Sequence, residues 1–241
     1  MNDPRTKLAH LPVGVQSHID DYVALLLELG GDRVDSVTLF GRVLDASFDV
    51  ETQAIRNILV ADSVDLGLLR RISEQGVKLG GFGLTAPLFM TPAYISRSLD
   101  TFPLELLDIQ MRHATVHGTD QFVGLKLNDA DVRLQCEREL KVVLIGMRQG
   151  LLASTGDERR LRGLGAEVGE GLIRTLRGML WLSGERDYLT TPALLDAMEK
   201  KVGRELPGLR AALDAQDHGG WDQFQLLYAD VEALGAMADA N

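Results

Sequence analysis

The apolar positions of the first 125 residues follow two different periods. They recur every three or four residues over 13–29 and 65–75, which predicts two amphipathic helices. The pair Gly30-Gly31 ends the first of these helices. Short apolar runs predict four strands, at 34–40, 55–61, 86–90 and 104–109, the last continuing irregularly towards His117-Gly118. Thr91-Pro92 predicts the start of another helix, because Thr is a good N-cap and Pro fits the first helical position.

The character of the chain changes at Asn128, which is placed to cap a long helix. Beyond it only helical periodicity is found, and four further helices are predicted, at 161–181, 192–202, 206–215 and 221–237. No repeat or flexible linker separates the halves. We therefore expect an α/β domain over 1–127 and an all-helical domain over 128–241 that packs on it.

Composition narrows the class of protein without naming its activity. The 241 residues carry 25 Lys and Arg against 35 Asp and Glu, a formal net charge of −10, which argues against a nucleic-acid partner. One cysteine, Cys136, excludes an intrachain disulfide and a multi-cysteine zinc site. The start of the chain lacks a signal-peptide core, and no run of 18 apolar residues follows. We expect a cytoplasmic protein with no membrane contact.

The most informative local pattern is Ser36-Val-Thr-Leu-Phe-Gly-Arg42, followed after a variable loop by the strand Asn57-Ile-Leu-Val60. This arrangement resembles the opening of the nucleotidyltransferase-fold superfamily, which places Gly-Ser after one strand and Asp-x-Asp at the start of the next. The segments 86–92, 97–109, 133–140 and 147–151 are similar to uncharacterised bacterial nucleotidyltransferase-domain proteins. The resemblance implies a small mixed sheet with helices, and a cleft that receives a nucleotide.

The physical reason for the family pattern is phosphoryl chemistry. Backbone N–H groups at a tight glycine turn approach the triphosphate. Two carboxylates separated by one residue of a strand face the same side and share divalent metals, which clamp the attacking and leaving oxygens.

This chain departs from that pattern at the decisive positions. Ile55 and Asn57 stand where the two carboxylates belong, and Arg42 stands in place of the small serine. Isoleucine cannot bind a metal, and an amide offers one neutral oxygen in place of a carboxylate. The first hypothesis is therefore a catalytically degenerate protein that needs no cofactor and binds a nucleotide, another small ligand or a partner chain, with Gly41, Arg42 and Asn57 lining the cleft.

A second hypothesis is that the protein is an active enzyme. An active nucleotidyltransferase would hold Mg²⁺ with loop carboxylates, Asp45, Asp49 or Glu51, and would use Glu105 or Asp108 of the predicted fourth strand as the catalytic carboxylate. It would move a nucleoside monophosphate to an acceptor that the sequence does not identify.

A third hypothesis assigns the function to the helical half. Its apolar stripe, Leu172, Ile173, Leu176, Met179 and Leu180, is either a homodimer face or ordinary core. His113 and His117 have the spacing of metal ligands on a helix but lie in a region predicted as extended, where ordinary partly buried histidines are favoured. Cys136 falls inside an amphipathic helix, where a buried, inert thiol is expected.

Overall fold

A computed structural model describes residues 5–214 and 220–239 of the chain. The chain divides into two compact units. One combines residues 1–99 with 108–126 and holds the sheet. The other combines residues 100–107 with 127–241 and is helical. Each unit is described by itself, and the two are called here the sheet unit and the helical unit.

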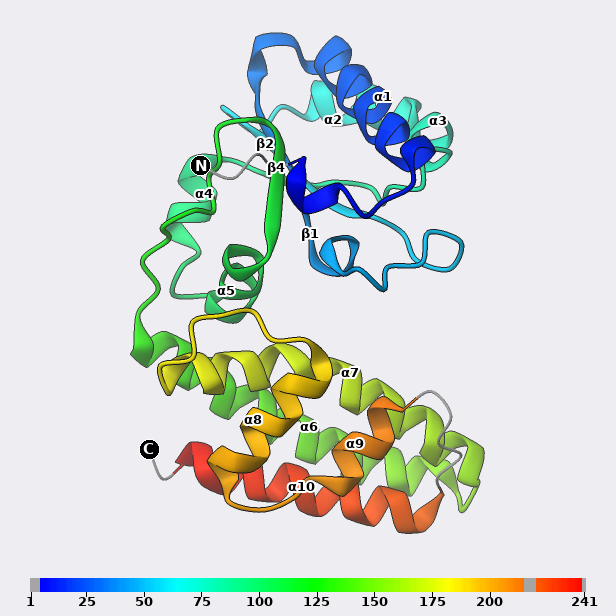
Figure 1. Ribbon diagram of the computed structural model, residues 1–241, viewed down its shortest axis with the longest axis vertical. Helices are drawn as coiled ribbons and strands as arrows, with labels where there is room; N and C mark the ends of the chain where they lie inside the picture. The colour runs from blue at the N-terminus through cyan, green and yellow to red at the C-terminus, as the bar shows by residue number, and fades with distance from the viewer. Residues whose placement is uncertain (1–4, 215–219, 240–241) are drawn as a thin grey trace. The chain divides into compact units, whose positions relative to one another are not determined.

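The sheet unit is built on four strands in the order β3-β2-β1-β4 (Figure 1). The strands are β1 (Val34–Phe40), β2 (Arg56–Ala61), β3 (Leu88–Met90) and β4 (His113–Gly118). β1 pairs antiparallel with both β2 and β4, and β2 pairs parallel with β3. The sheet is therefore mixed. The strands predicted at 34–40, 55–61 and 86–90 are confirmed within one or two residues.

Helices of different lengths connect and cover these strands. They are η1 (Thr6–Leu8), α1 (Val13–Gly30), η2 (Gly31–Arg33), η3 (Gly41–Leu44), α2 (Leu66–Glu74), α3 (Gly76–Gly80) and α4 (Pro92–Arg97). Two predicted starts are confirmed by their caps. Asp65 accepts a hydrogen bond from the Gly67 N–H at 2.8 Å, and Thr91 Oγ1 accepts one from the Tyr94 N–H at 3.0 Å.

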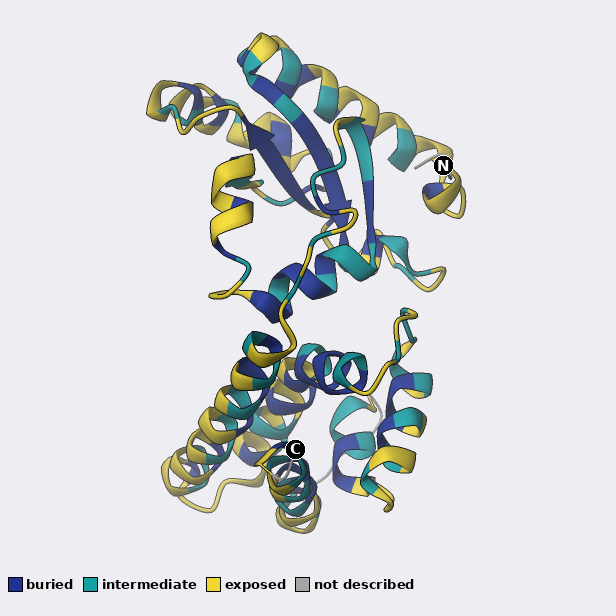
Figure 2. Cartoon of the chain, turned by 90° about the vertical axis from the view of Figure 1, so that its left-hand side faces the viewer, coloured by how far each residue is buried: buried dark blue, intermediate teal, exposed yellow. Residues whose placement is uncertain are grey.

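The hydrophobic core of the sheet unit lies between α1, α2 and one face of the sheet (Figure 1). Tyr22 and Leu26 of α1 pack there with Val37 and Leu39 of β1 and Leu59 of β2, all fully buried. Residues 37 and 39 are two apart, so they share a face of the strand. Figure 2 shows β1 and β2 buried along most of their length, so both faces of these strands are covered.

The segment predicted as the fourth strand is a helix. Residues 104–109 lie inside α5 (Pro103–Met111), and the strand that pairs with β1 is β4, which begins at His113. A short apolar run such as Leu104–Ile109 fits either structure, because periodicity does not separate a buried helix from a buried strand over six residues. The helix begins where Gln135 Oε1 accepts the Leu104 N–H at 2.9 Å, a contact 31 residues away in sequence.

The helical unit contains five long or medium helices, as predicted. They are α6 (Asp129–Ser154), α7 (Glu158–Leu182), α8 (Thr191–Val202), α9 (Pro207–Leu213) and α10 (Trp221–Asp239). Asn128 caps α6 through the Ala130 N–H at 2.9 Å, which confirms its predicted role. The helix predicted over 206–215 ends earlier, at Leu213, where Asp214 leaves the helical conformation; residue 215 itself lies outside the described residues.

The packing of α9 on α10 depends on one glycine. A Cβ at Gly208 would lie 2.0 Å from the backbone nitrogen of Leu227, so a larger residue would force the two helices apart. Asp230 of α10 then accepts the Leu209 N–H at 3.0 Å and receives Arg204 at 2.6 Å. The buried carboxylate thereby satisfies the N-terminus of α9.

The apolar stripe predicted on α7 belongs to the core of the helical unit. Leu172 and Leu176 are fully buried, and Met179 and Leu180 are each 5% exposed. Ile173 is partly buried, and four of the five residues of the stripe are buried in the core of the helical unit. Exposed apolar side chains occur instead on α6, at Leu134, Val142, Ile145 and Leu152.

Candidate functional site

The turn after β1 has the backbone conformation that the sequence pattern requires. Gly41 has φ = 78°, in the left-handed region that favours glycine, and no other group lies near its Cβ position. The backbone conformation at residue 41 therefore favours glycine, whereas the space around it would admit a larger side chain. Arg42 follows at the surface, in the first turn of η3, and its side chain has no hydrogen bond or ion pair with another described residue. It is the exposed cation of this turn.

Asp45 is engaged by the fold. Its carboxylate forms an ion pair with Arg112 at 2.5 Å, and both side chains are largely buried. Arg112 also donates to the Leu44 carbonyl. The pair joins the end of η3 to the start of β4, so Asp45 is not free to serve as a metal ligand in this arrangement.

The other two loop carboxylates lie beyond η3. Asp49 accepts the Glu51 N–H at 3.0 Å and the Thr52 hydroxyl at 2.8 Å. These two hydrogen bonds, led by that of Thr52, lower the pKa of Asp49. The carboxylate stabilises its own turn, whereas Glu51 is exposed and contributes only its backbone to that turn.

Asn57 faces the hydrophobic core and not an open cleft. Its side chain is 1% exposed and lies beneath α1, where the Tyr22 hydroxyl donates to Oδ1 at 2.8 Å. The Asn57 Nδ2 donates to the Thr85 carbonyl at 2.8 Å. Burial raises the pKa of Tyr22 to about 12, with the hydrogen bond to Asn57 opposing the shift in part, so the phenol stays a donor at neutral pH.

Ile55, at the other position of the missing pair, is 2% exposed and belongs to the same core. With residue 55 apolar and residue 57 already bonded on both sides of its amide, the start of β2 presents no side chain to a metal. The expectation that Asn57 lines a ligand cleft is corrected accordingly, since its amide is enclosed in the core and forms a hydrogen bond at both its oxygen and its nitrogen.

Glu105 and Asp108 lie on a helix instead of the predicted strand. Glu105 belongs to the helical unit, where Gln135 Nε2 donates to it at 2.9 Å and Arg174 pairs with it at 3.2 Å. Asp108 is one turn further along α5 and is counted in the sheet unit. The structure therefore places Glu105 in a polar cluster of the helical unit and gives it a role at the start of α5.

The residues that the structure describes include no group of three or more His, Cys, Asp or Glu side chains arranged to hold a metal ion. Cys136 is 1% exposed, and burial raises its pKa to about 12, so it is the inert thiol that the sequence predicted. Within the same described ranges, no helix combines the length and apolar character needed to cross a membrane.

A buried histidine–carboxylate pair was missed by the sequence reasoning. His113 Nε2 lies 2.9 Å from Asp120, and its Nδ1 lies 2.8 Å from the Ile109 carbonyl. Since both partners are acceptors, both hydrogen bonds form together only when the imidazole carries two protons. The sequence spacing suggested His117 as the partner of His113, whereas the partner in the structure is Asp120. Apart from its place shortly after Gly118, nothing in the local sequence marks Asp120 as that partner.

The Asp120 carboxylate is further tied to its own loop. Burial acts to raise its pKa, but the hydrogen bond from His113 and the backbone N–H groups of Phe122 and Val123 outweigh it and hold the pKa below its ordinary value. The pair fixes the loop after β4 and is structural in this geometry.

Comparison with known proteins adds no identity: no family model matches the chain, and no curated protein is significantly similar to it.

Proposed function

We propose that the protein is a nucleotidyltransferase-fold binding protein that has lost metal-dependent catalysis. The observation that carries the proposal is the position of Asn57, whose side-chain amide lies inside the core and forms hydrogen bonds with Tyr22 and Thr85. A metal-dependent transferase needs two carboxylates at the surface of a cleft, sharing the metal. Here the corresponding positions are an isoleucine and an enclosed amide.

The loop carboxylates do not replace the missing pair. Asp45 is bound to Arg112, and Asp49 is bound to its own turn. Recruiting either as a metal ligand would first break a hydrogen bond or ion pair that stabilises the fold. This favours the binding hypothesis over an active enzyme.

The ligand that fits the remaining features of the turn is an anion. Arg42 is exposed, carries a positive charge without a partner among the described residues, and follows a glycine in a tight turn. The phosphate groups of a nucleotide are the ligand class proposed for it, on the strength of the resemblance to the nucleotidyltransferase fold. Arginine binds phosphate through its fork of N–H groups.

A thermal-shift experiment tests this function. We expect nucleoside triphosphates to raise the melting temperature without Mg²⁺, because a ligand of the native state stabilises it by mass action. Arg42→Ala should remove most of that shift. Arg97→Ala, which removes an exposed arginine of α4 in the same unit, is the matched control and should leave the shift unchanged.

Two results would count against the proposal. Stabilisation that appears only with Mg²⁺ or Mn²⁺ would mean that the carboxylates rearrange into a metal site, and the transferase hypothesis would lead. Absence of any shift, or equal loss in both arginine variants, would remove the turn at Gly41 from consideration as a ligand site.

A further inference from the structure

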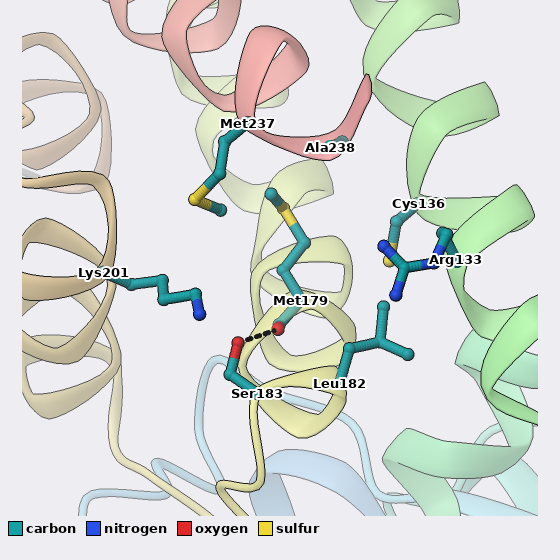
Figure 3. A pocket seen from close by; sticks show the side chains of 8 residues that line it. All are labelled: Arg133, Cys136, Met179, Leu182, Ser183, Lys201, Met237 and Ala238. Atoms are coloured by element: carbon teal, nitrogen blue, oxygen red, sulfur yellow. Dashed lines mark hydrogen bonds between the residues drawn. The ribbon is translucent and has the colours of Figure 1, made fainter. Parts of the chain in front are cut away.

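The helical unit contains a cavity of about 80 Å³ (Figure 3). Four helices or their ends contribute its lining, which consists of Arg133, Cys136, Met179, Leu182, Ser183, Lys201, Met237 and Ala238. Figure 3 shows Lys201 extending from α8 on one side and Arg133 from α6 on the other, with Met179 and Leu182 between them. The cavity therefore combines an apolar middle with a cation on each side.

The two cations have no partner of their own. Neither Arg133 nor Lys201 forms a hydrogen bond or ion pair with another described residue. One carboxylate of α6, that of Glu137, is already engaged. Lys141 holds Glu137 of α6 and Asp239 of α10.

The same is true on α8. Arg210 pairs with Asp196 at 2.5 Å and with Glu199 at 2.6 Å. Two acidic side chains of the helix that carries Lys201 are thus neutralised by an arginine of α9. Neither of these two carboxylates pairs with Lys201.

Helix C-termini often absorb lysine charge through their free carbonyls, but the end of α7 is already capped. The Ser183 hydroxyl donates to the Met179 carbonyl at 3.0 Å, as the dashed line in Figure 3 shows. The Ser183 N–H donates to the Leu180 carbonyl at 2.9 Å, and the Gly184 N–H to the Trp181 carbonyl at 3.0 Å. These carbonyls are satisfied within the chain.

The thiol in the lining adds no negative charge. Burial raises the pKa of Cys136 to about 12, so the group is neutral at pH 7. The remaining lining is thioether and aliphatic, from Met179, Leu182, Met237 and Ala238. Methionine side chains adapt their shape to small apolar groups.

Size restricts the ligand further. Cavities of about 150 Å³ accommodate benzene, so one of about 80 Å³ suits a short carbon chain and excludes a nucleotide. We propose that this cavity binds a short aliphatic dicarboxylate, with one carboxylate toward Lys201, the other toward Arg133, and the carbon chain against Met179 and Leu182. The cavity lies in a different unit from the turn at Gly41, so this proposal is tested independently of the function proposed for that turn.

The methionines provide a direct readout. In the full chain labelled with ¹³C-methyl methionine, titration with succinate should shift the Met179 and Met237 resonances saturably. Met90 and Met111, which are counted in the sheet unit, are internal controls and should not move. Butyrate, which has the same chain length and a single carboxylate, should bind more weakly.

Matched variants test whether Lys201 and Arg133 each bind a carboxylate of the ligand. Lys201→Met and Arg133→Met should each raise the succinate dissociation constant about tenfold, the effect of losing one charge-assisted contact. Lys200→Met removes the neighbouring exposed lysine of α8 and should leave binding unchanged. The proposal is overturned if Met179 and Met237 do not respond, if Met90 and Met111 respond equally, or if Lys200→Met weakens binding as much as Lys201→Met.

Discussion

Two sets of polar side chains, one in each unit, differ in whether the fold supplies their partners. In the sheet unit, side chains at the expected site are bonded to other residues of the fold. Asn57 forms hydrogen bonds with Tyr22 and Thr85, and Asp45 forms an ion pair with Arg112. In the helical unit, Arg133 and Lys201 line a cavity without forming a hydrogen bond or ion pair with any described residue. Asn57, expected from the motif to line a cleft, is enclosed, whereas two cations that the motif did not indicate line a cavity without a partner among the described residues.

The difference shows that residue type alone does not make a site. A buried polar group must find a partner, because leaving it unpaired costs about 1–3 kcal/mol. Because β2 directs the Asn57 side chain toward α1, its amide forms its hydrogen bonds within the core. A cation at the edge of a cavity remains hydrated at little cost and stays available to an anion.

The sharpest test of the closed position is Asn57→Asp, which restores a carboxylate at one place in the missing pair. The new charge would be buried and would face the Thr85 carbonyl that now accepts from Nδ2. We expect the free energy of unfolding to fall by about 3–5 kcal/mol, as for an uncompensated buried charge. Urea denaturation measures this, and calorimetric titration should detect no Mg²⁺ binding, because Ile55 still occupies the other position.

The matched control for that variant is Asn128→Asp, the same substitution at the exposed N-cap of α6. Aspartate caps a helix as well as asparagine, so the stability should hardly change. If both variants behave alike, or if Asn57→Asp binds Mg²⁺, the contrast between an enclosed and an available polar residue does not hold.

A second test asks whether the helical unit also depends on an enclosed polar side chain. Asp230→Ala removes the acceptor of the Leu209 N–H and the partner of Arg204. The loss of stability should be about 2–3 kcal/mol, because a buried N–H at the start of α9 is left unpaired. Chemical denaturation followed by circular dichroism measures it.

For comparison, Asp222→Ala removes an exposed aspartate of the same helix. It should change the stability far less. Equal effects of the two substitutions would show that Asp230 has no special role in joining α9 to α10.

The smallest expected effect concerns pH and the pair of His113 and Asp120. The pKa of Asp120 is lowered in the folded state, so its contribution to stability is full above the unfolded value of about 3.9 and is lost as pH falls through the folded value. Asp120→Asn should therefore make stability less dependent on pH below about 4. Urea denaturation over a series of acidic pH values provides the measurement.

Asp32→Asn is the control for this series, because Asp32 is exposed in the same unit and has no hydrogen bond or ion pair with a described residue. Its pH dependence should match that of the unmodified chain. An unchanged acid dependence in Asp120→Asn would mean that the pair with His113 contributes nothing to folding.

Much of the fold follows from local sequence. The apolar periods of residues 13–29 and 65–75, the caps at Thr91 and Asn128, the pair Gly30-Gly31 and the short apolar runs of the strands are signals that act within a few positions of the chain. They predicted α1, α2, α4, α6 and the first three strands within one to three residues. The sequence also identified Cys136 as inert, because its place on an amphipathic helix already implied burial.

Only the tertiary structure decided the rest. The helix over 104–109 begins with a hydrogen bond from the Leu104 N–H to Gln135, and Asn57 is bonded to Tyr22, so both residues have partners more than 30 positions away in sequence. The partners of Asp45 and His113, and the cavity between Arg133 and Lys201, likewise arise from segments brought together by packing. Local patterns report periodicity and capping, whereas the partner of a polar group is set by the fold as a whole.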